Sequence, residues 1–285
     1  MKARDDSMKV RIAHSPDSDD AFMFWALSQG VLDTEGLVVE HVLADIETLN
    51  QAAFEGRYEV TALSVHAYAY LHERYQLMPS GASFGDGYGP VVVAREGLTR
   101  DDVAGMEVAI PGRLTTAALA LRLWQPAVRT KVYPFDRILE VVAGGEAAAG
   151  VVIHEGQLTY AEEGLAAVVD LGAWWGEQTR GPLPLGANGI RRDLPERTKR
   201  LLCRLLKQSI ERGLAQREEA LDYALTYARG IEHDRARADR FVGMYVNDWT
   251  RDYGPRGRAA VQGLLDRGHA AGLLPERVEA EFVAA

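Results

Sequence analysis

Apolar and polar residues follow two different periods along the chain, and the two periods alternate from residue 9 to about residue 193. Short runs of small and β-branched residues, such as KVRIAHS (9–15), are followed by segments with helical spacing, such as DDAFMFWALSQG (19–30). This alternation predicts βαβ units and a mostly parallel sheet. The next expected strands and helices are LVVEHVLA (37–44), DIETLNQAAFEG (45–56), YEVTALS (58–64) and VHAYAYLHERY (65–75).

The same rhythm restarts after a glycine-dense stretch, GASFGDGYGPVVVAREG (81–97). A second stretch rich in glycine and proline, RGPLPLGANGIRRDL (180–194), precedes a nearly all-helical region that begins at Pro195. The elements expected between the two stretches are strands at 106–112, 128–134, 148–155 and 165–172 and helices at 115–124 and 135–146.

Two such crossings, one outward and one back, predict an α/β protein of two lobes with the second lobe inserted into the first. The larger lobe is expected to comprise residues 1–94 and 188–285, and the smaller lobe residues 95–187. The cleft between two such lobes is the default position for a ligand.

Composition and charge narrow the partners that we expect. The chain has 285 residues, 47% of them hydrophobic, and a net charge of −9 without a block of Lys or Arg. A nucleic acid or a membrane surface is therefore not expected as the main partner. The single cysteine, Cys203, excludes an intramolecular disulfide and a multi-cysteine metal site, and its helical context predicts a buried small hydrophobe.

The N-terminal segment MKARDDSMKV is charged and leads directly into the first expected strand. It contains no apolar core of a secretory signal, and the chain has no run of about 18 apolar residues that could span a membrane. We therefore expect a cytoplasmic protein. The apolar faces of the terminal helices fit either a homodimer or the core of the protein itself.

One polar pair stands where the pattern predicts a buried strand to end. In GVVIHEGQLTY (150–160), His154 and Glu155 follow a run of small and β-branched residues. The carboxyl ends of strands in open α/β sheets are where ligands usually bind. His154 is therefore either a proton-transfer group that faces the cleft or a histidine that only hydrogen-bonds a neighbouring loop.

Two further stretches place hydroxyl groups at the start of an expected helix. IPGRLTTAALAL (110–121) puts Thr115 and Thr116 at a helix N-terminus, which suits a carboxylate or phosphate, although a single threonine there could simply be an N-cap. The spacing of a phosphate-binding P-loop is absent. Ser64 also lies between a strand and a helix, with the same two readings.

The stretch SPDSDDAF (15–22) gathers three acids, Asp17, Asp19 and Asp20, before an expected helix. Acids are favoured at a helix start by the macrodipole without any ion. The glycine and distal glutamate of a calcium loop are missing, so no metal site is expected here.

Taken together, these motifs resemble the 1,4-dihydroxy-6-naphthoate synthase (MqnD) family of the futalosine route to menaquinone. The resemblance extends from about residue 9 to residue 193 and, more loosely, through the terminal helices. It rests on the ordered stretches SPDSDDAF, TALSVHAYA, GYGPVVVA, IPGRLTTA, PFDRIL, VVIHEGQLTY and LGAWWGEQTRGPLPLGA. The HE-x3-TY and tryptophan-bearing stretches are specific when they occur together.

This resemblance implies a fold like that of type II periplasmic binding proteins, used as an intracellular enzyme. It implies a lyase that converts cyclic dehypoxanthinylfutalosine, a small anionic molecule, to 1,4-dihydroxy-6-naphthoate without metal or organic cofactor. The family's catalytic histidine falls on His154. Its substrate-binding residues fall on Ser64, Thr115 and Thr116.

Departures from the family pattern matter at three positions in two motifs. Asp19 and Ala21 stand where the family usually has Asn and Thr, and Ala62 stands where it often has Lys. An added acid and a lost lysine would weaken the binding of a carboxylate, so the exact substrate stays open. Two alternatives also stay open, a non-catalytic solute-binding protein for a small carboxylate and the related chorismate dehydratase.

Overall fold

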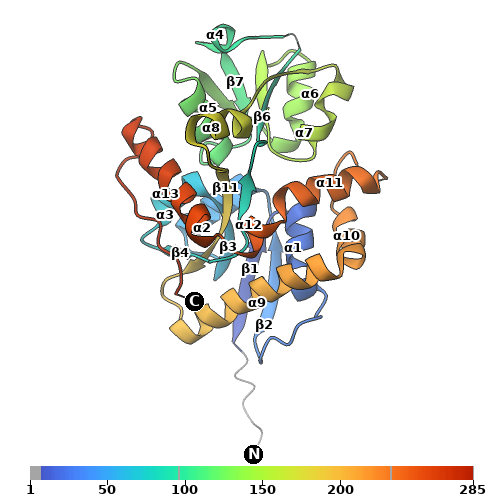
Figure 1. The fold of residues 1–285 in the computed structure, drawn as a ribbon, viewed down its shortest axis with the longest axis vertical. Coiled ribbons are helices and arrows are strands. Elements are labelled where there is room, and N and C mark those ends of the chain that lie inside the picture. Colours follow the sequence, from blue (N-terminus) through green and yellow to red (C-terminus); the bar gives the residue numbers. More distant parts are fainter. Residues whose placement is uncertain (1–7, 96, 232, 285) are drawn as a thin grey trace, which may run out of the picture.

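The structure is a computed structural model that describes residues 8–95, 97–231 and 233–284. It contains two sheets, one above the other in the view of Figure 1. The first sheet has the strand order β2-β1-β3-β11-β4, and β5 pairs with β11. Its strands are β1 (Lys9–His14), β2 (Val38–Leu43), β3 (Val60–Ser64), β4 (Tyr75–Leu77), β5 (Ser83–Gly85) and β11 (Leu183–Arg191).

The second sheet has the strand order β10-β6-β9-β7-β8. Its strands are β6 (Val91–Ala94), β7 (Glu107–Ile110), β8 (Arg129–Val132), β9 (Ala149–Val152) and β10 (Ala166–Asp170). The helices of this smaller lobe are α4 (Arg100–Val103), α5 (Thr116–Trp124), α6 (Ile138–Ala143), α7 (Gly156–Thr159) and α8 (Leu171–Thr179), with short 3-10 helices at Phe135–Arg137 and Tyr160–Glu163.

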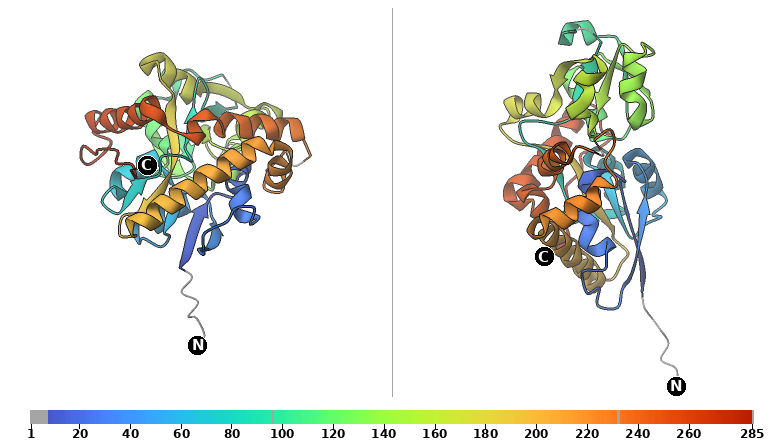
Figure 2. Two further views of the ribbon diagram at one scale, coloured as in Figure 1. Left: turned by 60° about the horizontal axis from the view of Figure 1, so that its bottom comes forward. Right: turned by 90° about the vertical axis from the view of Figure 1, so that its right-hand side faces the viewer.

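The larger lobe contains α1 (Ser18–Ser28), α2 (Ile46–Phe54) and α3 (Val65–Leu71) together with the C-terminal helices. These last helices are α9 (Glu196–Ala215), α10 (Arg217–Leu225), α11 (Arg235–Tyr245), α12 (Asp248–Arg251) and α13 (Gly254–Ala270). Helix α1 lies against α9, α10 and α11, and Figure 2 shows α9 crossing the larger lobe obliquely. Cys203 of α9 is buried in this apolar packing, as the sequence predicts.

Two expectations about the sheets need correction. The boundaries predicted at residues 94 and 187 lie several residues too late, because β6 pairs with β9 and β10 while all of β11 belongs to the first sheet. Both sheets are also mixed rather than mostly parallel. Strand β11 runs antiparallel to β3, and β6 runs antiparallel to β9. Each of these two strands enters its sheet directly from a crossing between the lobes.

One apolar cluster is shared by the two lobes. It joins Val65 and Tyr68 of α3 to Val108 of β7 and Ala117 of α5, and helix α13 adds Leu264. These side chains are at most 3% exposed. The lobes are therefore held together by buried apolar surface, which we call the shared cluster.

The segment that leads from the larger lobe to the smaller lobe lies directly against the start of α8 at Tyr88 and Gly89. A Cβ atom on Gly172 would lie 1.9 Å from the carbonyl oxygen of Tyr88, closer than any real Cβ contact. Gly172→Ala is therefore expected to destabilise the protein by about 1–3 kcal/mol, as overpacking does. Gly176→Ala is the matched control in the same helix, because its Cβ would meet nothing within 4 Å. Urea unfolding of the two variants measures the difference, and equal stabilities would contradict this packing.

Candidate functional site

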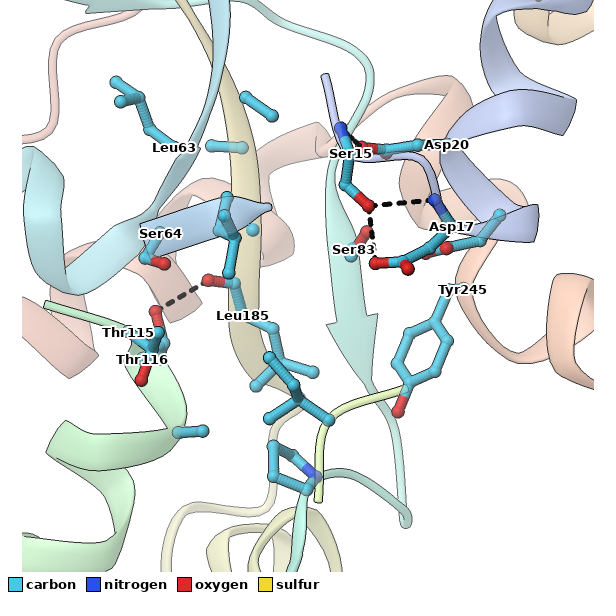
Figure 3. Close-up of a pocket in the computed structure, with 18 of the residues that line it drawn as sticks. Ser15, Asp17, Asp20, Leu63, Ser64, Ser83, Thr115, Thr116, Leu185 and Tyr245 are labelled. Carbon is cyan, nitrogen blue, oxygen red and sulfur yellow. Dashed lines mark hydrogen bonds between the residues drawn. The ribbon is translucent and has the colours of Figure 1, made fainter. Parts of the chain in front are cut away.

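A cavity lies between the two lobes, with about 770 Å³ of empty space when its open mouth is included. It is lined by residues that lie far apart in the sequence and come from both lobes. Figure 3 shows its labelled polar side chains in two groups on opposite sides. One group comprises Ser64, Thr115 and Thr116, and the other comprises Ser15, Asp17, Asp20, Ser83 and Tyr245.

The first group forms what we call the donor wall, and Ser64 is one half of it. Ser64 stands between β3 and α3, where its side chain is 3% exposed. Its hydroxyl oxygen accepts a hydrogen bond from Asn50 Nδ2 at 3.1 Å, and its backbone N–H donates to Asn50 Oδ1 at 3.0 Å. Because Ser64 Oγ already accepts a hydrogen bond, its own proton is the group it can offer to a ligand.

The other half of the donor wall is the N-terminus of α5. Thr115 is the N-cap, and its hydroxyl accepts from Ala118 N–H at 3.2 Å and donates to the Gly112 carbonyl at 2.9 Å. The Thr116 hydroxyl donates to the Leu185 carbonyl at 2.6 Å and accepts from the backbone N–H of His66. Both hydroxyls are thus occupied within the protein. The groups that α5 can offer to an anion are the backbone N–H groups of its first turn, at the positive end of its dipole.

The acids of SPDSDDAF form the opposite side, which we call the acid wall. Asp20 accepts from the backbone N–H of Ser15 at 2.8 Å, and Asp17 pairs with Arg229 at 3.2 Å. Burial raises the pKa of Asp20 to about 7. Burial also raises the pKa of Asp19 well above its usual value, and the charges of the neighbouring carboxylates raise it further. Sequence reasoning treated these acids as a helix start and missed that they face the ligand cavity.

The departures from the family pattern fall unevenly around this cavity. Asp19 and Ala62 both line it, whereas Ala21 is buried in the apolar packing of α1. Within the described part of the chain, no group of three or more His, Cys, Asp or Glu side chains is arranged to hold a metal ion.

His154 lies beside the cavity rather than on its surface. Strand β9 ends at Val152, three residues earlier than the pattern predicts, so His154 lies in a turn. Its neighbours Ile153 and Gln157 line the cavity, but His154 does not appear among the lining residues that the structure describes. These three residues lie close in space because they are close in the sequence, but the sequence does not determine which way each side chain points.

Both ring nitrogens of His154 have partners within the protein. Nε2 lies 3.1 Å from the Phe135 carbonyl oxygen, and Nδ1 accepts from the Gly156 N–H at 3.1 Å. This arrangement fixes the neutral tautomer with its proton on Nε2, since a carbonyl can only accept. Burial lowers the pKa of His154 even though the carboxylate of Asp17 acts in the opposite direction.

Glu155 turns toward the larger lobe instead. It is fully buried, and its Oε1 accepts from the Ser18 hydroxyl at 2.7 Å. Its Oε2 has no hydrogen-bond partner among the described residues. Burial, and next the charge of Asp17, raises the pKa of Glu155 to about 7.

The two lobes are in direct polar contact along the edge of the acid wall. Tyr245 at the end of α11 donates to Gln157 Oε1 of α7 at 2.7 Å, and both side chains line the cavity. Arg237 of α11 forms an ion pair with Glu162 of the smaller lobe. On this edge the two lobes are therefore bridged by a hydrogen bond and an ion pair.

Comparison with known proteins assigns the family. The model of a family described as menaquinone biosynthesis matches residues 10–270. The 1,4-dihydroxy-6-naphthoate synthase of Thermus thermophilus is 44% identical over 264 residues, which cover 93% of this chain and 95% of that protein. The chain belongs to the 1,4-dihydroxy-6-naphthoate synthase family. The Streptomyces coelicolor enzyme of the same name is 35% identical, again over 93% of this chain and 95% of its own length.

Solved structures confirm the fold that this family membership implies. A crystal structure of an Archaeoglobus fulgidus protein, 49% identical, superposes with a TM-score of 0.89 and covers 93% of this chain and 98% of its own. The alkanesulfonate-binding protein of Xanthomonas axonopodis superposes with a TM-score of 0.71 at 13% identity, over 95% of this chain and 96% of its own. The fold is the two-lobed type II fold of periplasmic binding proteins.

Membership of this family makes the chain an enzyme of menaquinone biosynthesis. Among the described residues, no helix is both long and apolar enough to cross a membrane. The expected cytoplasmic location, anionic small-molecule substrate and homodimer stay predictions, as do the roles of His154, Ser64, Thr115 and Thr116.

Proposed function

We propose that the chain converts cyclic dehypoxanthinylfutalosine to 1,4-dihydroxy-6-naphthoate, as a cytoplasmic lyase of the futalosine pathway. The donor wall is the observation that carries the proposal. It brings the Ser64 hydroxyl and the first N–H groups of α5 to one side of the cavity, and such a set of donors suits a carboxylate. The names and identities of the two curated relatives support this substrate over other carboxylates.

In this proposal His154 is the general base. Its lowered pKa keeps the imidazole neutral at pH 7, so Nδ1 carries a lone pair that can take a proton from the substrate. That lone pair accepts the Gly156 N–H in the present structure. Catalysis therefore requires the turn at residues 154–156 to rearrange when substrate occupies the cavity.

A second candidate function is that of a non-catalytic binding protein for a small carboxylate. Two observations favour it, the fold shared with the alkanesulfonate-binding protein and the engagement of both His154 nitrogens within the protein. It would use the same donor wall without a base. The two functions differ in whether the bound molecule changes.

Incubation of the purified protein with cyclic dehypoxanthinylfutalosine, followed by chromatography for 1,4-dihydroxy-6-naphthoate, tests the proposal. We expect this product at catalytic turnover and no consumption of chorismate in a parallel reaction. Consumption of chorismate would instead assign the related dehydratase activity. Tight binding of the substrate without any product would favour the binding protein.

A further inference from the structure

Helix α2 carries two polar side chains that reach the two halves of the donor wall. Glu47 and Asn50 are three residues apart and so lie on one face of the helix. Neither of them lines the cavity as the structure describes it, although Ile46 of the same helix does. Any influence they have on a ligand must therefore act through other residues.

Asn50 contacts Ser64 with both ends of its amide. The backbone N–H of Ser64 can only donate, so the Asn50 atom 3.0 Å away must be the carbonyl oxygen Oδ1. This settles the orientation of the amide, and it makes the atom 3.1 Å from Ser64 Oγ the donor Nδ2. The hydroxyl of Ser64 is thereby held as an acceptor toward Asn50 and left as a donor toward the cavity. Asn50 is fully buried, so water does not compete for these contacts.

Glu47 holds the other half of the donor wall from the same helix. Its Oε2 accepts from the backbone N–H of Leu114 at 3.2 Å, and its Oε1 accepts from Gln51 at 3.0 Å. Gly112 packs so closely on Glu47 that a Cβ there would lie 2.3 Å from Oε2. The loop of residues 112–114, which leads directly into α5, therefore rests on a side chain of the larger lobe.

We propose that α2 assembles a carboxylate-binding site from both lobes, with Asn50 orienting the Ser64 hydroxyl and Glu47 holding the loop that sets the N-terminus of α5. Both are positioning residues. The inference rests on the proposed function only in taking the anion to be the substrate's carboxylate. It adds two residues to the site that no resemblance or motif in the sequence indicates.

Asn50→Asp gives the sharpest test of the Asn50 role. Aspartate keeps the acceptor for the Ser64 N–H but has no donor for Ser64 Oγ, so the hydroxyl proton turns toward the aspartate and away from the ligand. A hydrogen bond to a charged group is worth about 1.5–3 kcal/mol. We therefore expect KM to rise roughly 10- to 100-fold, as for Ser64→Ala, with kcat changed less than about threefold.

A double-mutant cycle separates positioning from general stability. If Asn50 acts through Ser64, Asn50→Ala should raise KM strongly in the wild-type chain and have almost no further effect in Ser64→Ala. Additive effects of the two substitutions would overturn the Asn50 role. Thr48→Ala is the matched control, because Thr48 is exposed on the same helix and should give wild-type KM and kcat.

The Glu47 pair remains informative even if the Asn50 variants fail to fold. Glu47→Gln keeps an oxygen that can accept from the Leu114 N–H, whereas Glu47→Ala removes it. We expect Glu47→Ala to raise KM about 5- to 10-fold, as for the loss of one hydrogen bond, and Glu47→Gln to restore it to within about twofold of wild type. Equal effects of the two substitutions would overturn the Glu47 role.

Calorimetric binding of 2-naphthoate, a plain aromatic carboxylate, distinguishes failure of this inference from failure of the proposed function. The same variants should weaken this binding by the same factors even if the chain turns over a different substrate. If the wild-type protein binds 2-naphthoate and none of the Asn50 or Glu47 variants weakens it, the assembly by α2 is wrong. If the wild-type protein binds no carboxylate, the donor wall itself is wrong.

Discussion

His154→Asn is expected to lower kcat by about 100-fold or more while KM stays within a few-fold of wild type, as for removal of a positioned base. The asparagine oxygen can still accept the Gly156 N–H that Nδ1 now accepts at 3.1 Å, so the turn keeps its shape. Steady-state kinetics with cyclic dehypoxanthinylfutalosine give both constants. The donor wall is untouched, so affinity is preserved while proton transfer is lost.

The pH profile of the wild-type enzyme provides the control. Because burial lowers the pKa of His154 below its usual 6.5, kcat should fall only at a pH below that value. This acid limb should be absent from the residual activity of His154→Asn. Near-normal turnover of the variant would assign proton transfer to another group that faces the cavity. Asp19 and Asp20 are then the first candidates, because both line the cavity and have raised pKa values.

Glu155→Gln is expected to stabilise the protein above pH 7 and to leave its stability nearly unchanged at pH 4. Burial raises the pKa of Glu155 from its usual 4.5 to about 7. The folded state therefore binds an extra proton between these values, and wild-type stability falls as the pH rises through this window. One pKa unit corresponds to about 1.4 kcal/mol, so the gain at pH 8 is roughly 3 kcal/mol.

Urea unfolding of the wild type and the variant at several pH values measures this difference. The slope should not vanish in Glu155→Gln, because Asp20 also has a pKa raised to about 7. Ser18 keeps its acceptor in the variant, so the contact between lobes is preserved. A variant with the same pH slope as the wild type would show that Glu155 does not carry a buried charge at pH 8.

The sequence predicted the elements near the site well because these depend on local pattern. The strand before Ser64, the helix that starts at Thr116 and the strand before His154 all lie within a few residues of their expected places. Apolar periodicity and helix-capping preferences act over a few residues and can be read directly. The strand before His154 was predicted to end three residues too late, since Ile153 continues the apolar pattern after pairing ends.

The parts that could not be predicted depend on contacts between distant residues. Nothing local in VVVA (91–94) says that it pairs with β9 and β10 rather than with the first sheet. The hydroxyl of Thr116 is committed to Leu185, which lies 69 positions away in the chain. Asn50 carries no motif at all, because an asparagine within a helix has no signal until the fold brings Ser64 beside it.

The shared cluster has a consequence for how the lobes can move. It joins them on the side of α3, α5 and α13, where Val65 and Ala117 are the chain neighbours of Ser64 and Thr116. On the edge of α7 and α11 the contacts are polar, and water can replace them at little cost. We therefore expect the two lobes to rotate apart about a hinge at the shared cluster, which lies beside the donor wall, and to separate at the edge of α7 and α11. The anionic group of the ligand can then bind first at the donor wall, next to the hinge. The lobes close afterwards, which brings the acid wall over the rest of the ligand and re-forms the hydrogen bond between Tyr245 and Gln157.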